Sequence, residues 1–227
     1  EFRRVLFRSE LVSNDRIIGG MTEACANRAR KLYKLAVEGD CVETDCRTAE
    51  MAKLTENSFR DVNIAFANEL SLICDKLGIN VWELIRLANR HPRVNILQPG
   101  PGVGGHCIAV DPWFIVSQAP EEAKMIRTAR ETNDSKPEWV LGKVHEAVSQ
   151  HEEETGEAAR IACFGLAFKP NIDDLRESPA LGIAKKLVEA YPGRVDVVEP
   201  FVEALPASFG NQARLVRPTE AVRACDV

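Results

Sequence analysis

The sequence lacks a basic excess and long apolar runs, and it contains only four histidines. Its 227 residues carry 29 Lys and Arg against 34 Asp and Glu, so no positively charged surface for nucleic acid is expected. No stretch approaches the roughly 20 apolar residues of a membrane span, and no secretory signal peptide is recognisable. These absences favour a cytoplasmic protein, without a membrane segment, whose seven cysteines are reduced.

The histidines and cysteines also lack the spacing of a metal site. Cys41 and Cys46 stand apart from other cysteines and from histidines, so no zinc site is expected. His91 and His106 each stand alone beside a glycine-rich loop. A histidine in that setting usually bonds to the backbone, so neither is expected to be a catalytic base.

Glycine and proline are concentrated in one stretch, Pro99-Gly-Pro-Gly-Val-Gly-Gly-His-Cys-Ile-Ala-Val-Asp-Pro112. Such a loop is expected to hold one shape around Cys107 and Asp111. Cys107 has flexible and polar neighbours, which suits a thiolate that a substrate must reach, so it is a candidate nucleophile. Residues 100–105 also fit the dinucleotide fingerprint, which needs a strand before it and a helix after it. We expect neither the strand nor the helix at this loop. Pro112 in particular should stop a helix.

A long helical pattern runs over residues 48–77 and carries an unusual polar stripe. Its members lie three or four positions apart and share one face: Lys53, Asn57, Asp61, Ile64 and Asn68. One interpretation is a solvated face. The other is a functional face, on which Lys53 and Asn57 offer a cation and an amide to an oxyanion. The helix alone leaves both open.

Elements expected around this helix follow from apolar periodicity and capping residues. Gly78 is expected to end the long helix, and Asn80 to cap the next, over residues 80–90. Asp134 or Ser135 is expected to cap a new helix with Pro137 in its first turn. The remaining expectations are strands over 15–20 and 41–44, helices over 22–38, 121–131 and 134–150, and an acidic linker over 152–157.

Beyond that linker the pattern becomes strand, loop, helix, strand. Strands are expected over residues 160–168 and 194–200, and Ser178 and Pro179 should open a helix that ends at Ala190. This alternation predicts a parallel sheet whose ligands bind at the carboxyl ends of the strands, here residues 169–176. Lys169 and Arg176 at that edge are candidate phosphate ligands.

The chain resembles the UDP-glucose/GDP-mannose dehydrogenase family from about residue 10 to its end. The resemblance rests on Lys53, Asn57, Cys107 and Asp111, and on the segment Phe168-Lys-Pro-Asn-Ile-Asp-Asp-Leu-Arg-Glu-Ser-Pro179. Gly-Gly-His-Cys-Ile-Ala-Val-Asp-Pro is similar to the branch that oxidises UDP-N-acetylhexosamines, where UDP-glucose enzymes have Cys-x-x-Lys-Asp.

The resemblance implies an α/β protein, with a helical central dimerisation region followed by a truncated Rossmann-like parallel-sheet domain. Residues 1–9 are expected to be a cloning scar and 10–47 a remnant of an NAD-binding domain. Residues 48–151 would form the central dimerisation and catalytic-loop domain, and 158–227 an incomplete domain that binds the UDP-sugar. The implied partners are a UDP-sugar and a second copy of the chain.

The implied reaction is an NAD-dependent, four-electron oxidation of the C6 alcohol of UDP-N-acetyl-D-mannosamine to the uronic acid. Cys107 adds to the aldehyde formed first, Lys53 and Asn57 stabilise the oxyanion, and Asp111 positions water for thioester hydrolysis. The residues that would contact the substrate are Arg93, Gly104, Phe168, Lys169 and Arg176.

Two alternatives remain open from the sequence. UDP-N-acetylglucosamine and UDP-glucose are alternative substrates, because pocket shape rather than any single residue distinguishes such sugars. A non-catalytic module for dimerisation and nucleotide-sugar binding is the alternative from another class. Because the NAD domain is expected to be almost wholly missing, the isolated chain is expected to be inactive.

Overall fold

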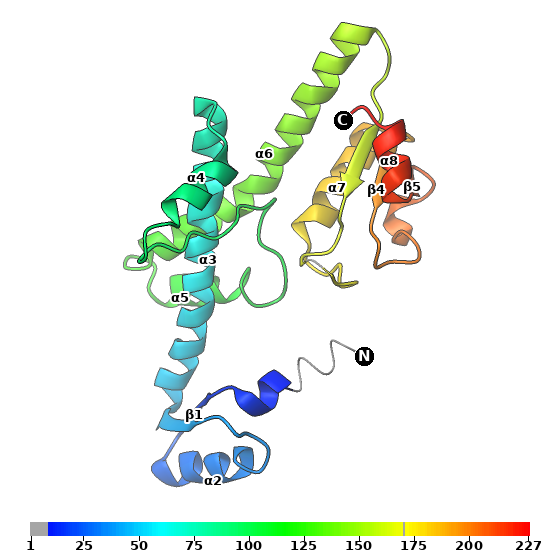
Figure 1. The fold of residues 1–227 in the computed structure, drawn as a ribbon. Helices are drawn as coiled ribbons and strands as arrows, with labels where there is room; N and C mark the ends of the chain where they lie inside the picture. The colour runs from blue at the N-terminus through cyan, green and yellow to red at the C-terminus, as the bar shows by residue number, and fades with distance from the viewer. Residues whose placement is uncertain (1–8, 170) are drawn as a thin grey trace. The chain divides into compact units, whose positions relative to one another are not determined.

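The computed structural model describes residues 9–169 and 171–227 (Figure 1). Residues 1–8, most of the expected cloning scar, lie outside the described residues. The chain forms two compact units, Glu1–Asn57 and Ser58–Val227. Helix α3, Cys46–Leu77, begins in the first unit and ends in the second.

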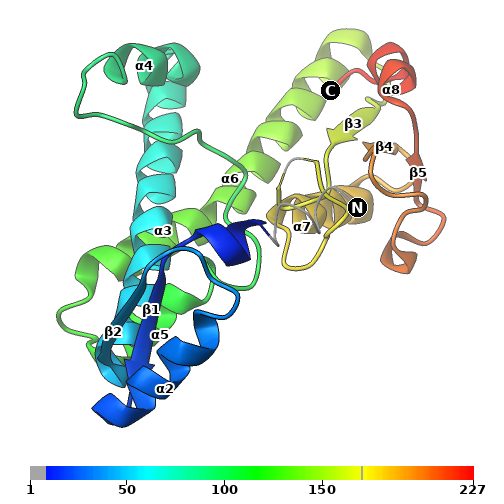
Figure 2. The ribbon, with the colours of Figure 1, turned by 60° about the horizontal axis from the view of Figure 1, so that its bottom comes forward.

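The first unit contains a strand–helix–strand motif, as the sequence predicts. Strand β1 (Arg16–Gly20) pairs in parallel with strand β2 (Cys41–Asp45), and helix α2 (Glu23–Tyr33) connects them. Figure 2 shows the two strands side by side. Thr22 caps α2, because its side chain accepts a hydrogen bond from the backbone N–H of Cys25 at 3.2 Å.

The second unit contains the rest of α3, followed by helices α4 (Val81–Ala88), α5 (Asp111–Gln118) and α6 (Lys124–Thr155). The expected end of α3 is confirmed, since Gly78 has a left-handed backbone with φ of 67°. The cap of α4 is also confirmed. The Asn80 side chain accepts the backbone N–H groups of Trp82 and Glu83 at 3.0 and 3.2 Å.

The prediction of two helices meeting near residue 134 is wrong, because α6 is a single helix that continues through Pro137. Neither expected capping residue acts as a cap. The Asp134 carboxylate accepts from Arg130 in the preceding turn, and the Ser135 hydroxyl donates to the Thr132 carbonyl at 2.9 Å. Both bonds are typical of a helix interior. Pro137 removes one N–H donor from α6, but the helix continues past it.

The expectation that Pro112 stops a helix is also wrong. Helix α5 begins at Asp111 and carries Pro112 in its first turn. Proline is tolerated there, because the N–H groups of the first turn have no partner within the helix. The loop before this helix, residues 94–110, contains no helix or strand, as expected.

The acidic run over residues 152–157 is less of a linker than predicted. Helix α6 extends to Thr155 and ends at Gly156, whose φ is 73°. Glu152 lies inside the helix and accepts hydrogen bonds from the side chain of Arg194 and the N–H of Ala159. The charged run therefore fastens the end of α6 to the sheet domain that follows.

The C-terminal part forms the expected parallel sheet, in the order β3-β4-β5. Its strands are β3 (Ile161–Phe164), β4 (Val195–Val198) and β5 (Ala213–Leu215). Helix α7 (Pro179–Ala190) connects β3 with β4, and its Ser178 cap is confirmed. A short 3-10 helix, η1 (Ala207–Phe209), precedes β5, and helix α8 (Pro218–Ala224) follows it.

One hydrophobic core joins α6, α7 and this sheet. Its fully buried members include Val148, Ile161, Leu187 and Val197. None of the helices in residues 9–169 and 171–227 has the length and apolar character that crossing a membrane requires.

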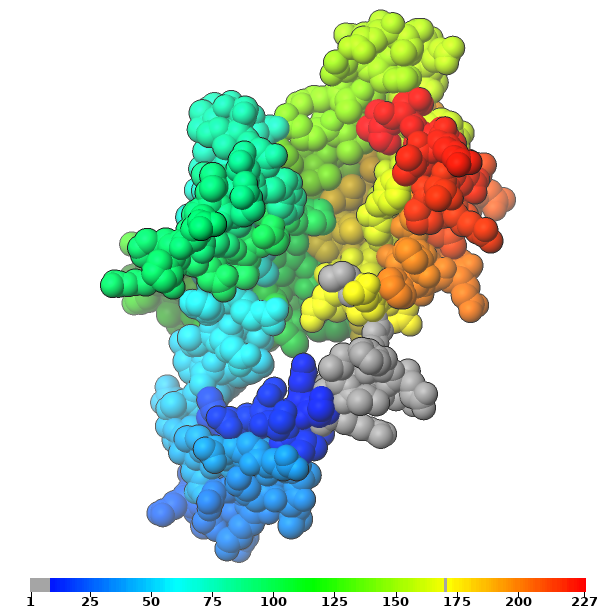
Figure 3. Space-filling model, in the orientation of Figure 1, coloured from blue at the N-terminus to red at the C-terminus, as the bar shows by residue number. Residues whose placement is uncertain are grey.

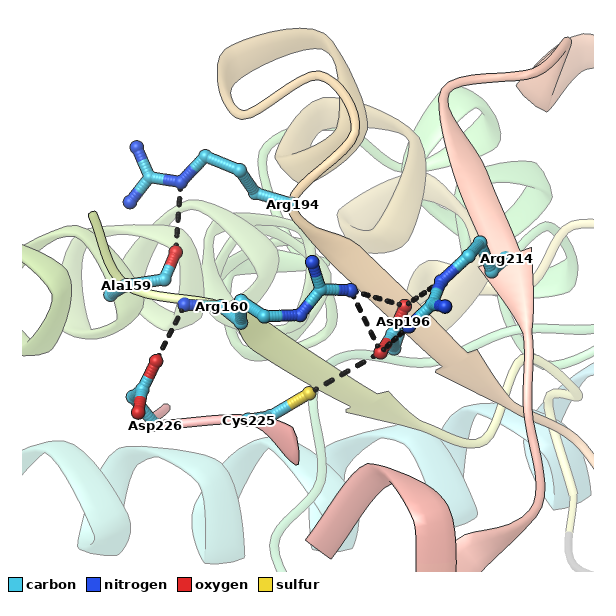
Figure 4. Close-up of polar contacts among 7 residues, drawn as sticks. All are labelled: Ala159, Arg160, Arg194, Asp196, Arg214, Cys225 and Asp226. Atoms are coloured by element: carbon cyan, nitrogen blue, oxygen red, sulfur yellow. Dashed lines mark hydrogen bonds and ion pairs between the residues drawn. The ribbon is translucent and has the colours of Figure 1, made fainter. Parts of the chain in front are cut away.

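A buried carboxylate connects the strands of this sheet (Figure 4). Asp196 in the middle of β4 is fully buried and accepts hydrogen bonds from Arg160 at 3.0 and 3.1 Å and from Arg214 at 2.9 and 2.7 Å. Burial alone would raise the pKa of Asp196, but the bonds from the two arginines outweigh it and lower the pKa. The thiol of Cys225, which follows α8, also donates to Asp196 at 3.7 Å. These partners come from the ends and neighbours of the three strands, so we assign the cluster to the fold rather than to a site.

Candidate functional site

The predicted nucleophile lies at the end of the glycine-rich loop, where helix α5 begins. Cys107 is exposed, and its backbone carbonyl accepts the N–H groups of Val110 and Asp111 at 3.0 and 2.8 Å. These two bonds close a turn that ends at Asp111, the first residue of α5. An exposed thiol is what the predicted nucleophile requires, because a substrate must reach it.

The loop packs closely against the segment that follows β3. A Cβ atom built on Gly104 would lie 2.6 Å from the carbonyl oxygen of Glu177 and 2.7 Å from Cβ of Phe168. A Cβ on Gly105 would lie 3.1 Å from the Phe168 ring. Only glycine fits these approaches. The structure therefore brings together Gly104 and Phe168, two residues that the sequence predicts as substrate contacts.

A third glycine of the loop meets two prolines from different helices. The Cβ position of Gly102, whose φ is 139°, lies 3.0 Å from Pro179 on α7 and 3.3 Å from Pro137 on α6. The space beside these glycines is therefore filled by the protein itself. At Gly102, Gly104 and Gly105, the glycines therefore serve close packing of the loop against the neighbouring segments.

The segment after β3 carries the predicted phosphate ligands at the protein surface, where Figure 3 shows it in yellow. Lys169 is exposed, and its ammonium nitrogen lies 5.5 Å from the centre of the Phe168 ring. Arg176 is also exposed, and its Nε and Nη2 donate to Asp174 at 2.9 and 2.7 Å. Hydrogen bonds from Arg176 hold the pKa of Asp174 well below its usual range. Arg176 is therefore already paired with a carboxylate, whereas Lys169 presents its charge beside an aromatic ring.

The amides at the carboxyl end of β3 are bonded to a carboxylate of the same sheet. Glu199, which follows β4, accepts the N–H of Leu166 at 2.8 Å and that of Ala167 at 3.2 Å. Its other oxygen accepts the N–H of Phe201 at 3.2 Å. In a dinucleotide-binding sheet, amides at this position hold a phosphate. Here an internal anion takes that place, so this edge is not a dinucleotide site.

The polar stripe of α3 is mostly buried, so its interpretation as a solvated face is wrong. Asn57, Asp61 and Asn68 are 3%, 0% and 0% exposed. Lys53 is the exposed member and forms an ion pair with Glu56 at 3.2 Å. Lys53 and Asn57 belong to the first unit, and Cys107 and Asp111 belong to the second.

Three buried polar residues on α6 were not predicted. Arg130, Asn133 and Lys136 are 1%, 1% and 3% exposed. Arg130 Nη1 donates to the Asp61 carboxylate at 2.6 Å, and Asn133 Nδ2 donates to the same oxygen at 2.8 Å. The three residues recur at a spacing of three, which was the available signal, but the helix break expected at residue 134 concealed it.

Two glycines at the end of β1 pack closely against helices. A Cβ on Gly19 would lie 2.7 Å from the side chain of Ala49, and one on Gly20 would lie 2.5 Å from the backbone nitrogen of Ala26. Glycine at these positions therefore serves close packing of the strand.

The remaining predicted contact, Arg93, is exposed and lies ahead of the glycine-rich loop. Its backbone N–H donates to Nδ1 of His91 at 3.3 Å. The backbone-bonding role expected for His91 is thus confirmed.

Comparison with known proteins identifies two family domains in this chain. Residues 47–135 match the central domain of the UDP-glucose/GDP-mannose dehydrogenase family, and residues 162–227 match its UDP binding domain. The UDP-N-acetyl-D-mannosamine dehydrogenase of Salmonella typhi is 64% identical over 221 residues, covering 96% of this chain and 53% of that protein. The NDP-N-acetyl-D-galactosaminuronic acid dehydrogenase of Ralstonia solanacearum is 67% identical over 88% of this chain and 46% of its own length.

A solved structure is also similar to this chain. The UDP-N-acetyl-mannosamine dehydrogenase of Staphylococcus aureus superposes with a TM-score of 0.75 at 50% identity, over 86% of this chain and 46% of that one. The chain spans about half the length of the curated relatives it matches. Both matched domains, and the predicted motifs that lie within them, lead to one assignment: the chain belongs to the UDP-glucose/GDP-mannose dehydrogenase family.

Proposed function

We propose that this chain is the catalytic-loop and nucleotide-sugar-binding part of an NAD-dependent nucleotide-sugar 6-dehydrogenase. One observation carries the proposal: the loop that bears Cys107 is seated, through Gly104, on Phe168. Phe168 lies in the part of the chain that matches the family's UDP binding domain. A substrate held there by its nucleotide would have its sugar near the exposed thiol. We propose residues 48–151 and 158–227 as the two working domains and 10–47 as part of an NAD-binding domain.

The proposed chemistry oxidises the C6 alcohol of the sugar to a carboxylate in two steps, each of which transfers a hydride to NAD⁺. The thiolate of Cys107 adds to the C6 carbonyl of the aldehyde formed first. Lys53 and Asn57 stabilise the resulting oxyanion, and Asp111 positions the water that hydrolyses the thioester formed by the second oxidation. Hydrolysis releases the uronic acid and returns the thiol.

We propose UDP-N-acetyl-D-mannosamine as the substrate. The similarity to UDP-N-acetyl-D-mannosamine dehydrogenases supports it. Lys169, Arg176 and Arg93 would supply positive charge to the diphosphate, with Phe168 against the nucleotide. The Ralstonia relative is equally similar and its name specifies a different sugar, so an N-acetylgalactosamine nucleotide is the second candidate.

We also propose that the chain forms a homodimer through α3. Phe59, Phe66 and Ile73 recur every seven residues along this helix and are 69%, 54% and 45% exposed. Seven residues make about two helical turns, so the three side chains form one apolar stripe. A second copy of the same helix would bury such a stripe. Phe66→Asp should shift the mass measured by light scattering from dimer to monomer, and a monomeric native chain would refute the dimer.

The function is tested in two steps. First, calorimetry should show that the 227-residue chain binds UDP, because the proposed nucleotide contacts all lie within it. Second, the chain is fused behind the N-terminal half of a 64% identical relative, and NADH is measured with UDP-N-acetyl-D-mannosamine, UDP-N-acetylglucosamine, UDP-N-acetylgalactosamine and UDP-glucose.

Two NADH per uronic acid would support a four-electron oxidation. UDP binding without NADH from any sugar, in a fusion whose relative is active, would favour the non-catalytic module. Absence of UDP binding would refute the proposed function.

A further inference from the structure

The loop that carries Cys107 is held at its start by a side chain of α3. The backbone N–H of Gly100 donates to Oδ1 of Asn68 at 2.8 Å. Residues 94–110 contain no helix or strand, so this bond is not part of a regular backbone ladder. Because the N–H can only donate, Asn68 must present its carboxamide oxygen to the loop.

The other end of the same carboxamide is bonded as well. Nδ2 of Asn68 donates to Oδ1 of Asn133 at 2.8 Å, and Nδ2 of Asn133 donates to Oδ1 and to the backbone carbonyl of Asp61 at 2.8 and 3.1 Å. Asp61 is in turn paired with Arg130 at 2.6 Å. Each amide is thus oriented by its neighbour, in a series of hydrogen bonds that runs from the ion pair of Arg130 and Asp61 to the loop.

A second set of bonds reaches the backbone of Asn68. The hydroxyl of Ser71 donates to the Asn68 carbonyl at 2.6 Å, and the ammonium group of Lys136 donates to that hydroxyl at 2.6 Å. Both the side chain and the backbone of Asn68 are therefore held by α6. At this depth, an amide turned the other way would lose its partners, which favours the observed orientations of Asn68 and Asn133.

The buried ion pair between Arg130 and Asp61 is weak evidence of added stability. Desolvation raises the pKa of Asp61, against the attraction of Arg130. Buried ion pairs often contribute no more stability than apolar residues of the same size. What this pair does is set the direction of the Asn133 amide, and thereby that of Asn68.

From these contacts we propose that Asn68 is a positioning residue, which relays the geometry of the Arg130 and Asp61 pair on the helices to the start of the Cys107 loop. Gly104 packs the same loop against Phe168. The loop is therefore held at Gly100 and again at Gly104 before it reaches Cys107. The inference rests on the proposed function, in which Cys107 must meet a sugar carbon with correct geometry. Poor placement of a reacting group by about 1 Å costs on the order of 100-fold in rate.

The test combines hydrogen exchange of the Gly100 amide with turnover of the fusion protein. In Asn68→Ala, the protection factor of Gly100 should fall at least about tenfold, and kcat should fall by about 10- to 100-fold, more than KM rises. The Asn133 side chain bonds to Asn68 and Asp61 rather than to Gly100, yet Asn133→Ala should also lower the protection factor of Gly100. Asn63→Ala is the matched control, because that amide on the same helix donates to the carbonyl of Phe59 one turn earlier in its own helix.

Asn68→Asp provides a readout that a residue filling space would not give. In its protonated form the new carboxyl group can accept from Gly100 and donate to Asn133, as asparagine does, whereas the carboxylate cannot donate. The carboxylate still accepts from Gly100, but it faces Oδ1 of Asn133 with no proton between the two oxygens, so the repulsion breaks the relay through Asn133. Gly100 protection relative to the native chain should therefore be near normal at low pH and fall as the carboxyl group ionises. The charged groups around it are Asp61, Arg130 and Lys136, with Asp134 beside Arg130 and Asp75 near Lys136.

Unchanged Gly100 protection in Asn68→Ala would overturn the proposal, and so would normal kcat in a variant with a loosened loop. A pH-independent Asn68→Asp variant would also contradict it. If the unsubstituted fusion makes no NADH, the proposed function fails, and the exchange measurements still decide whether Asn68 holds the loop. Circular dichroism of each variant separates these outcomes from loss of folding.

Discussion

The ammonium group of Lys136 donates to the hydroxyl of Ser71 at 2.6 Å from a position where only 3% of the lysine is exposed. The nitrogen also lies 3.6 Å from the ring centre of Trp139. Neither partner is an anion. Burial therefore dominates and lowers the pKa of Lys136 from 10.5 to about 8.

This shift predicts an unusual dependence of stability on pH. Between about pH 8 and 10.5 the unfolded chain keeps the Lys136 proton and the folded protein has released it, so this lysine makes stability rise with pH. Lys136→Met removes a buried charge and should raise the unfolding free energy by about 1–3 kcal/mol at pH 7. Denaturant titrations over pH 7–11 should show that gain shrinking above pH 8.

Lys143→Met on the same helix is the control with the opposite sign. Hydrogen bonds from its ammonium group to Asp75 and Glu146, both at 2.9 Å, raise the pKa of Lys143. A lysine with a raised pKa stabilises the fold at neutral pH and loses that effect as pH rises through the folded value. A loss of stability for Lys136→Met at pH 7, with Lys143→Met unchanged, would contradict this account.

Gly104 and Gly142 should respond oppositely to alanine. Gly104→Ala places a methyl group 2.6 Å from the Glu177 carbonyl, so the loop must move away from Phe168. UDP affinity and turnover of the fusion should both fall, by about tenfold or more. In Gly142→Ala, nothing lies within 4 Å of the new methyl group inside α6, so stability should rise by about 0.5–1 kcal/mol. Normal turnover of Gly104→Ala would show that the loop need not be seated there.

Local signals in the sequence were enough for the element ends that a single residue determines. Gly78 ends α3, Asn80 caps α4 and Ser178 caps α7, each through contacts within a few residues. Proline was different. Pro112 opens a helix and Pro137 lies inside one, and the presence of proline does not distinguish the two settings. What distinguishes them is the surrounding structure, which the local pattern does not contain.

The candidate site divides in the same way. Cys107 and its glycines were found from composition, because glycine, proline and a polar setting occur together in the sequence. The burial of Asp61 and Asn68 was not found, because their partners Arg130 and Asn133 lie 65 to 72 residues away on another helix. A stripe of polar residues on one helix shows that they share a face, and only the second helix decides whether water or protein covers it.

Glu199→Ala should destabilise the C-terminal sheet. The variant leaves the amides of Leu166 and Ala167 at the end of β3 without their acceptor, at a cost of about 1–3 kcal/mol for each amide that stays buried and unpaired. Urea titration measures the loss. Glu203→Ala, an exposed glutamate in the same connection, should change stability by less than about 0.5 kcal/mol. Equal effects of the two substitutions would show that the internal carboxylate is not needed.

Lys169→Ala should weaken UDP binding to the chain by about 1.5–3 kcal/mol, the usual size of a hydrogen bond to a charged group. Calorimetry gives the dissociation constant directly. Lys186→Ala is the control, because this exposed lysine pairs with exposed Glu138 and lies outside the proposed site. If the dissociation constant of UDP is unchanged in Lys169→Ala, Lys169 does not bind the diphosphate, and the other cations near the loop become the candidates.

The last prediction concerns Cys107→Ser in the fusion with an NAD-binding half. Serine keeps the size of the side chain but replaces the thiol with a hydroxyl, which is a far weaker nucleophile at neutral pH. The first oxidation forms no bond to the protein, so the alcohol can still become the aldehyde. The second requires the thiohemiacetal carbon that only a competent nucleophile creates.

The variant should therefore bind UDP-sugar normally and release at most one NADH per sugar, while production of the uronic acid falls by several orders of magnitude. Mass spectrometry of the products, with NADH counted in parallel, separates the aldehyde from the acid. Cys25→Ser is the matched control, because Cys25 is also exposed but lies on α2 and takes part in no proposed step. If Cys107→Ser still makes the acid at the native rate with two NADH per sugar, the glycine-rich loop is a structural turn and the nucleophile lies elsewhere.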